Sequence, residues 1–270
     1  MAEGRLTKAT VFLGGGRITS ALVAGLRLAR YKRPIVVYDR TPGKLQVLQR
    51  EWRVGIAHDL KSAVDRADIL IVAVRPSSVS GLLHEVAACG VRPRLSVSLA
   101  AGIPLRKLRA QLGPPARWAR AMPSPVCRIG CGLTAVCFDR SMEQNQRARV
   151  RALFEHVGPV LQIPERQFDA FTATYSSSHG YHALATLAKA GQDHGLDRKT
   201  ALTAAAHALS DAILYWRKSR LGLAKLLQEA ATPGGIAAAT MSGIDHSGYA
   251  EAVANGLKAG IAQARRNAKG

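Results

Sequence analysis

The sequence predicts a doubly wound α/β sheet in the first part of the chain and an all-helical region after it. Two observations support this prediction. Short apolar runs alternate with helical stretches through the first half, and these runs are continuous, as in parallel strands covered on both faces. After about Pro164 the strand-like runs disappear, and Ala, Leu and polar residues recur at helical spacing. We therefore expect one domain over residues 1–164 and a second over residues 165–270.

The predicted elements follow one another in a regular order. Residues 9–13, Ala-Thr-Val-Phe-Leu, predict a strand that leads through three glycines into an amphipathic helix at about residues 18–29. Further apolar runs predict four more strands, at residues 35–38, 69–74, 95–99 and 133–136. In the second part we expect helices over residues 183–190, 200–216 and 248–264. Their alanine-rich faces suit close packing of helices, including helices from two subunits.

The composition excludes several classes of protein. The 270 residues carry 38 Lys plus Arg and 18 Asp plus Glu, a net charge of +20, spread over many predicted elements without interleaved aromatics. Such dispersed charge indicates solubility or the steering of acidic ligands, so no nucleic acid is expected. No apolar run reaches the roughly 20 residues that cross a bilayer, and Met1–Arg5 has no apolar signal core behind it, so we expect a cytoplasmic protein without membrane contact. The four cysteines lack the spacing of a zinc site, and no metal is expected.

The three glycines at residues 14–16 stand in a context that gives a glycine motif meaning. They follow a predicted strand and open a predicted helix, as in the G-x-G-x-x-G turn, whose backbone amides and helix N-terminus hold a pyrophosphate. Thr19 replaces the last glycine, so helix and strand should pack slightly less closely there. A glycine-rich turn without a ligand is the alternative. We interpret the first part as a Rossmann-type dinucleotide-binding domain.

The end of the second predicted strand bears on the choice between NAD and NADP. An acidic residue there favours NAD through the ribose hydroxyls, whereas a nearby arginine accommodates the 2′-phosphate of NADP. The chain has Asp39 followed by Arg40 and Thr41, with Lys44 one turn later. Two cations and a hydroxyl outweigh one carboxylate that Arg40 could itself neutralise, so we predict NADPH and keep NADH as an alternative. Arg40 and Lys44 could also form a solvated start of a helix.

Several segments of the chain resemble, in order and spacing, the marks of the pyrroline-5-carboxylate reductase family. They are Phe12-Leu13-Gly14-Gly15-Gly16, Ala73-Val74-Arg75-Pro76, Ser98-Leu99-Ala100-Ala101-Gly102-Ile103, Arg120-Ala121-Met122-Pro123, Asp169-Ala170-Phe171-Thr172-Ala173, Pro233-Gly234-Gly235 and Ile244-Asp245-His246-Ser247-Gly248. The resemblance covers almost the whole chain.

The resemblance implies a Rossmann domain followed by a helical dimerisation domain, and hence a homodimer or a larger homo-oligomer. It implies NAD(P)H-dependent reduction of a small cyclic imine carboxylate, pyrroline-5-carboxylate to proline or a close analogue, in an active site between the two domains. The residues expected to bind the cofactor are Gly14, Gly16, Arg17, Ile18, Arg40, Lys44, Ala73, Val74, Pro76, Ala101, Gly102 and Ser124.

The departures from the family pattern cluster where the family binds substrate. The family's Ser-Gly-Ser-Gly-Pro-Ala-Tyr segment aligns with residues 175–181, where Ser176 and Ser178 fill the glycine positions and His179 replaces the proline. In the family's Thr-Ser-Pro-Gly-Gly-x-Thr segment, Ala237 replaces the last threonine, whose hydroxyl is expected to bond the imine nitrogen. Ser124 replaces an asparagine that faces the nicotinamide.

The replacements add polar groups, which indicates a repurposed pocket rather than a dead one. We expect His179, Tyr175 and Thr232 to serve catalysis, and the substrate to be bound by Ser176, Ser177, Ser178, Gly234 and Gly235. His179 and the nearby His182 could instead pack against the sheet domain or lie in an interface, and Tyr175 could merely narrow the pocket. Asp169 and Thr172 match the family, as residues of the site or as helix capping and interdomain structure.

Three functions remain open on the sequence. The first is reduction of pyrroline-5-carboxylate or a close analogue. The second is a specialised imine reductase with a different substrate. The third is a non-catalytic NADP(H)-binding protein with an acidic partner, which Ala237 and Ser124 favour because each has lost a family contact.

Overall fold

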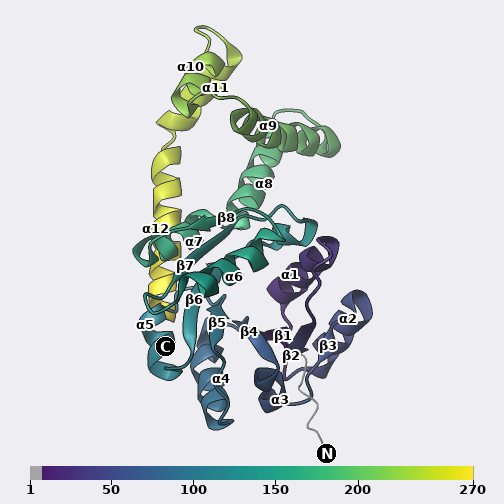
Figure 1. Cartoon of the computed structure of the whole chain (residues 1–270). Coiled ribbons are helices and arrows are strands. Elements are labelled where there is room, and N and C mark those ends of the chain that lie inside the picture. Colours follow the sequence, from purple (N-terminus) through teal and green to yellow (C-terminus); the bar gives the residue numbers. More distant parts are fainter. Residues whose placement is uncertain (1–7, 270) are drawn as a thin grey trace, which may run out of the picture. The chain divides into compact units, whose positions relative to one another are not determined.

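The structure of the chain, a computed structural model, describes residues 8–269 and is shown in Figure 1. The first part is built on an eight-stranded sheet with the order β3-β2-β1-β4-β5-β6-β7-β8. The strands are β1 (Ala9–Leu13), β2 (Ile35–Tyr38), β3 (Gly55–Ile56), β4 (Ala67–Val72), β5 (Leu95–Ser98), β6 (Arg117–Met122), β7 (Thr134–Phe138) and β8 (Val160–Gln162). All neighbours pair in parallel except β6 and β7, which are antiparallel.

The strand order reverses beside β1. The chain runs from β1 through β2 to β3 and then returns to β4 on the other side of β1. In open sheets of this kind ligands bind outside the carboxyl ends of the strands at that reversal. The predicted doubly wound sheet is therefore confirmed, and the reversal of strand order lies between β1 and β4.

Helices connect the strands of the sheet. They are α1 (Arg17–Leu28), α2 (Pro42–Trp52), α3 (Leu60–Asp65), α4 (Pro76–Ala88), α5 (Leu105–Gln111), α6 (Gln144–Glu155) and α7 (Phe168–Thr174), with the short 3₁₀ helices η1 (Pro125–Ile129) and η2 (Glu165–Gln167). α1 follows β1 as predicted, one residue earlier at each end.

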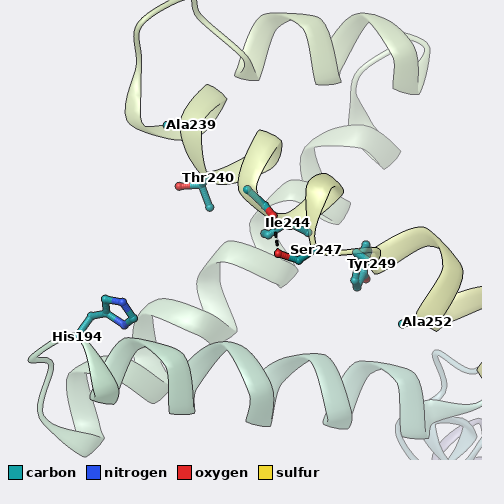
Figure 2. A pocket seen from close by; sticks show the side chains of 8 residues that line it. His194, Ala239, Thr240, Ile244, Ser247, Tyr249 and Ala252 are labelled. Carbon is teal, nitrogen blue, oxygen red and sulfur yellow. Dashed lines mark hydrogen bonds between the residues drawn. The ribbon is translucent and has the colours of Figure 1, made fainter.

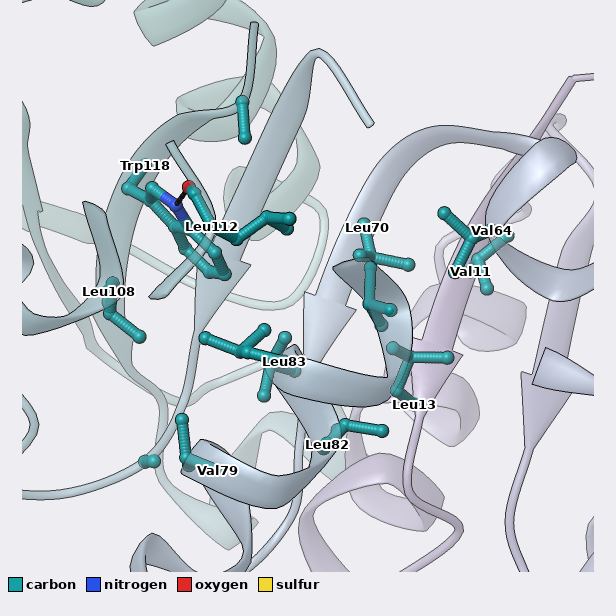
Figure 3. Packing of buried hydrophobic residues seen from close by; sticks show 14 of the residues in the cluster. Val11, Leu13, Val64, Leu70, Val79, Leu82, Leu83, Leu108, Leu112 and Trp118 are labelled. Carbon is teal, nitrogen blue, oxygen red and sulfur yellow. Dashed lines mark hydrogen bonds between the residues drawn. The ribbon is translucent and has the colours of Figure 1, made fainter. Parts of the chain in front are cut away.

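Apolar side chains cover both faces of the sheet. Val11 and Leu13 belong to one buried cluster, whereas Phe12 between them belongs to the other, because successive side chains of a strand point to opposite faces. Figure 3 shows part of the first cluster, which includes Leu83 of α4, Trp118 of β6 and residues of β1 and β4. The indole Nε1 of Trp118 donates to the carbonyl oxygen of Leu112 at 2.9 Å, so its one polar atom is satisfied.

Five predicted strands are present with small shifts in their bounds. β1 and β2 match the prediction, whereas β4 ends at Val72, so Ala73 and Val74 lie in the loop before α4. The strands β3, β6 and β8 were not predicted, because β3 and β8 are only two and three residues long and Arg117 and Arg120 interrupt the apolar pattern of β6.

The chain divides into two compact units. Within the described residues, one unit extends to Ala173 and takes in the chain again from Gly260, and the other comprises Thr174–Ala259. The second part is all-helical, as predicted, with α8 (Ser177–Asp193), α9 (Arg198–Lys218), α10 (Leu223–Ala230), α11 (Ile236–His246) and α12 (Tyr249–Asn267). The predicted domain boundary at residues 164 and 165 stays a prediction. No helix between residues 8 and 269 has the length and apolar character that would cross a membrane.

Candidate functional site

The turn between β1 and α1 is built around one close backbone approach. Gly14 has φ +112°, and a Cβ at this position would lie 2.6 Å from the carbonyl oxygen of Ala73. Its amide donates to the carbonyl oxygen of Tyr38 at 2.7 Å. Gly14 thus joins the ends of β1, β2 and β4, and only glycine fits its conformation and its surroundings.

The N-terminus of α1 is open at this turn. Gly16 is the N-cap residue and no side chain caps the helix, and a Cβ at Gly16 would meet nothing within 4 Å. The first turn of α1 contains no acidic residue. A helix start with uncapped amides and its dipole favours an anionic group. The Gly14–Ile18 segment therefore fits the pyrophosphate of a dinucleotide. The hydroxyl of Thr19, at the position of the third glycine, is buried and donates to the carbonyl oxygen of Gly14 at 2.6 Å.

Asp39, at the end of β2, braces the same turn. Its carboxylate accepts from the amides of Gly15 at 2.7 Å and Thr41 at 2.8 Å. The ammonium of Lys44 lies 3.3 Å from Oδ2. Burial by itself raises the pKa of Asp39, but these hydrogen bonds and the charge of Lys44 together hold that pKa below its ordinary value.

The expected neutralisation of Asp39 by Arg40 is wrong. Lys44 takes that place, and the guanidinium of Arg40 instead pairs with Glu85 of α4, at the surface. Lys44 begins close to Asp39 because α2 starts at Pro42, which brings the first turn of the helix back over the end of β2. Sequence spacing did not reveal Glu85, which lies 45 residues further along the chain.

The remaining residues expected to bind the cofactor lie at the carboxyl ends of the neighbouring strands. Ala73 and Val74 follow β4, and Pro76 begins α4. Gly102, after β5, has φ +81°, and a Cβ there would lie 2.2 Å from the carbonyl oxygen of Ala264 near the end of α12. Ser124, after β6, is 6% exposed, and its hydroxyl caps η1. The fold therefore brings these positions to the same end of the sheet, at the carboxyl ends of β4, β5 and β6.

Sequence reasoning missed a buried arginine of this unit. Arg120 of β6 is 2% exposed. Its guanidinium lies 3.0 Å from Asp169 Oδ1 and 3.4 Å from Glu165 Oε1. Asp169 thereby joins α7 to the sheet, while the hydroxyl of Thr172 donates to the carbonyl oxygen of Phe168 within the helix. An arginine in the middle of a strand flanked by Trp118 and Met122 was the available signal.

The segment at residues 175–179 spans the start of α8, which begins at Ser177, in the unit Thr174–Ala259, here called the helical unit. Ser176 is its N-cap residue, and the Ser176 hydroxyl accepts from the amide of Ser178 at 3.4 Å and lies 2.6 Å from the Ser178 hydroxyl. His179 donates its backbone amide to the carbonyl oxygen of Ser176, and its side chain is exposed. Ser177 and Tyr175 are partly buried. The serine that fills a glycine position thus caps the helix with its own side chain.

The second expected substrate segment begins α11. Thr232 accepts at its carbonyl oxygen from the amide of Gly235 at 2.9 Å, and Gly234 between them has φ +74°. Gly235 is the N-cap residue and no side chain caps α11. The amides at the start of α11 are therefore open to an anion, unlike those of α8.

A separate hollow of about 730 Å³ lies within the helical unit. Figure 2 shows Thr240, Ile244 and Ser247 from α11 and its end, with Tyr249 and Ala252 from the start of α12. His194, at the end of α8, also lines it. None of the residues that the sequence assigns to substrate or cofactor lines this hollow.

Two further chemistries find no support in the described part of the chain. Among residues 8–269 no three His, Cys, Asp or Glu side chains are placed to hold a metal ion together. Burial raises the pKa of the Cys127 and Cys137 thiols to about 12, so both stay protonated and unreactive near neutral pH.

Comparison with known proteins agrees with this geometry. Residues 165–267 match the family model for pyrroline-5-carboxylate reductase dimerisation, and residues 10–102 match that for NADP oxidoreductase, coenzyme F420-dependent. A pyrroline-5-carboxylate reductase from Mycobacterium tuberculosis is 32% identical over 267 residues, covering 89% of this chain and 90% of the relative. One from Synechocystis is 28% identical over 251 residues, covering 92% and 93%.

Solved structures show the same fold. The pyrroline carboxylate reductase of Plasmodium falciparum with NADP bound superposes with a TM-score of 0.85 at 20% identity, over 98% of this chain and 100% of that chain. The 1-pyrroline-5-carboxylate reductase of Streptococcus pyogenes gives 0.86 at 23% identity, over 96% and 99%. With the dimerisation match and the relative at 32% identity over nearly its full length, the chain belongs to the pyrroline-5-carboxylate reductase family.

Proposed function

We propose that this chain is an NADPH-dependent reductase that converts pyrroline-5-carboxylate to proline. The activity named for the relatives at 32% and 28% identity supports this, as does the NADP named in the structure from Plasmodium falciparum. The observation in this chain that carries the proposal is the β1–α1 turn. Gly14 admits no side chain beside the Ala73 carbonyl, and α1 begins without a side-chain cap. Such a cradle suits a pyrophosphate.

The surroundings of Asp39 support NADPH over NADH. To bind NADH, an acidic residue at the end of β2 accepts hydrogen bonds from the ribose hydroxyls. Here both carboxylate oxygens already accept from backbone amides and face Lys44. The Arg40 guanidinium next to it is exposed and suits the doubly charged 2′-phosphate.

In reduction of the imine, the main contribution of the protein is to orient the substrate toward the cofactor. When bound, NADPH supplies a hydride to the carbon of the C=N bond, and a proton on the ring nitrogen completes the amine. We propose that Thr232, the amides of Gly234 and Gly235, and the segment Ser176–Ser178 hold the carboxylate. Tyr175 or His179 holds the proton for the nitrogen. Holding the ring in one orientation is the main source of rate acceleration in such a reaction.

The proposal is tested by turnover of the purified chain. NADPH and NADH oxidation is followed at 340 nm with pyrroline-5-carboxylate and with a panel of cyclic imines that differ in ring size and in the presence of a carboxylate. We expect the highest kcat/KM with NADPH and pyrroline-5-carboxylate. If NADPH binds saturably but no imine in the panel causes its oxidation, the chain is the non-catalytic alternative. Absence of binding would contradict both.

A second candidate, a specialised imine reductase, rests on α8. The Ser176 hydroxyl caps this helix and Ala237 carries no hydroxyl, so the donors offered to a substrate differ from the family pattern. A site with a different set of donors selects a different substrate. A kcat/KM at least about tenfold higher for another cyclic imine in the same panel would identify it.

We propose that the chain acts as a homodimer through its helical unit. The match of residues 165–267 to a dimerisation family supports this, and so do large apolar side chains that this unit exposes. Examples are Ile213 at 53%, Trp216 at 48% and Ile236 at 87% exposure. Apolar surface of this extent is typical of an interface. The hollow of Figure 2 then offers room for side chains of the second copy.

We further propose that the chain works in a reducing compartment, the cytoplasm. All four of its cysteines are free. Cys131 is exposed, and a free exposed thiol persists where thiols are kept reduced.

A further inference from the structure

One cation of the sheet unit, the unit that extends to Ala173 and resumes at Gly260, is almost completely removed from solvent. Arg120 is the fourth residue of β6, between β5 and β7, and its side chain is 3% exposed. Trp118 and Met122, two residues before and after it, lie on the same face, because side chains alternate along a strand. That face carries the cluster of Figure 3, to which Trp118 and Phe168 belong. A charge has thus been placed inside an apolar layer.

The guanidinium is held there by three groups that come from one short stretch of chain. Asp169 Oδ1 lies 3.0 Å away and Glu165 Oε1 3.4 Å away, and the ring centroid of Phe168 lies 4.4 Å from the guanidinium carbon. The Nε atom is buried and has no hydrogen-bond partner among the described residues. Isolated buried charges are costly, so these partners are required for the fold to keep the arginine where it is.

The group formed by Arg120, Glu165 and Asp169 connects more elements than β6 and α7. Glu165 Oε1 also accepts from the amide of Leu105, the first residue of α5, at 2.6 Å. Only Ile103 and Pro104 separate Gly102 from α5, and only Pro123 separates β6 from Ser124. A single guanidinium therefore ties together the two loops after β5 and β6 and the start of α7. Both loops carry residues expected to contact the cofactor.

We propose that Arg120 is a positioning residue for imine reduction, which fixes the loops after β5 and β6 to α7 and thereby sets the geometry of hydride transfer. The proposal rests on the proposed function. The pyrophosphate turn at Gly14 lies after β1, which is separated from β6 by β4 and β5. Loss of Arg120 should therefore leave cofactor affinity largely intact and reduce the rate of the chemical step.

The test uses Arg120→Lys in the full-length protein, with Arg109→Lys as the matched control. Arg109, in the second turn of α5, also pairs with a buried carboxylate, that of Asp139 at 2.9 Å, which lies beside the first half of β6 rather than at its carboxyl end. Lysine keeps the charge but loses the two-armed fork and the stacking on Phe168. The measurements are the NADPH stoichiometry and Kd, kcat and KM per cofactor-binding chain, and hydrogen exchange at the Leu105 amide.

We expect Arg120→Lys to bind NADPH with full stoichiometry and a Kd within about threefold, while kcat falls about tenfold or more, because small displacements cost rate steeply. Hydrogen exchange at the Leu105 amide should become faster. Arg109→Lys leaves the bond from this amide to Glu165 in place and should change neither kcat nor this exchange. Asp169→Asn should lower kcat and Asp169→Glu should restore most of it, which keeps the test valid if Arg120→Lys fails to fold. Unchanged kcat per cofactor-binding chain in both Arg120→Lys and Asp169→Asn overturns the proposal. Inactivity of the unaltered chain with every imine instead overturns the proposed function.

Discussion

Asp39 shows how the role of a residue depends on what already satisfies it. The type and place of this residue, an acid at the end of the second strand, favour a contact with ribose hydroxyls. In the folded chain the carboxylate is 12% exposed and accepts from two amides, so it braces the β1–α1 turn instead. Arg40 is in the opposite situation, since its ion pair with Glu85 lies at the surface, where such pairs contribute little.

Glu85→Gln is expected to tighten NADPH binding. The carboxylate of Glu85 competes with the 2′-phosphate for Arg40, so its removal should lower the Kd of NADPH about two- to fivefold at low salt and leave that of NADH unchanged. Arg40→Ala should raise the Kd of NADPH about tenfold or more, as expected for a lost charge-assisted bond. Fluorescence titration measures both, with Glu51→Gln on the exposed side of α2 as control. An equal change for NADH and NADPH would contradict this role of Arg40.

At the scale of elements, close contacts between backbones locate the helices around the site. Gly25 in α1 faces η1, and a Cβ at Gly25 would lie 2.0 Å from the carbonyl oxygen of Cys127. η1 begins directly after Ser124, so this contact sets the distance between α1 and the loop after β6. Gly81 in α4 is also helical, but a Cβ there would meet nothing within 4 Å.

Gly25→Ala and Gly81→Ala should therefore have opposite effects. Gly25→Ala forces two backbones apart and is expected to lower the free energy of unfolding by about 1–3 kcal/mol. Gly81→Ala should raise it by about 0.5–1 kcal/mol, since alanine favours the helix and nothing obstructs its methyl group. Urea unfolding of the two variants beside the unaltered chain checks both signs. Equal effects of the two substitutions would show that α1 does not approach η1 as described.

Asp139, the residue after β7, links a buried charge to acid stability of the sheet unit. It is 2% exposed, accepts from the Ser141 amide at 2.8 Å and hydroxyl at 2.7 Å, and pairs with Arg109. Burial by itself raises the pKa of Asp139. The hydrogen bonds from Ser141 and the charge of Arg109 together lower it by more, so the net shift is downward.

A carboxylate with a lowered pKa stabilises the folded state above its unfolded pKa of about 3.9, and this stabilisation is lost as pH falls through the lower folded pKa. We therefore expect the difference in unfolding free energy between the unaltered chain and Asp139→Asn to be constant from pH 7 to about 5 and to narrow below about 4. Denaturant titrations at several pH values measure it. A difference in unfolding free energy that increases as the pH falls would contradict the predicted direction of the effect.

On the scale of the whole molecule, charge and apolar surface are distributed unevenly. The excess of basic residues lies almost entirely in the sheet unit, where an anionic cofactor would bind. The large exposed apolar side chains lie mostly in the helices of the other unit, above all along α9 at Leu202, Ile213, Leu214, Tyr215 and Trp216. The sheet unit thus suits an anionic ligand, and the helical unit exposes the apolar side chains through which we propose that it dimerises.

Charge introduced on α9 should separate the subunits. Ile213→Glu together with Leu214→Glu places two carboxylates on an apolar face, which is costly to bury in an interface. Light scattering after gel filtration should show the unaltered chain as a dimer or larger assembly and the variant as a monomer. Lys218→Glu, at the end of the same helix, controls for the charge alone. A monomeric unaltered chain would contradict the proposed assembly.

The sequence by itself determined five of the eight strands and the first helix of the first part, the all-helical second part and the glycine turn after the first strand. These features depend on periodicity and on residues that act on their own backbone, such as Gly14. Only the tertiary structure decided which partners the charged groups have: Lys44 for Asp39, Glu85 for Arg40, and Glu165 and Asp169 for Arg120. The last three of these partners lie 45 or more residues away along the chain. Sequence spacing cannot reveal such pairs, because the folding of the sheet alone brings them within a few ångströms.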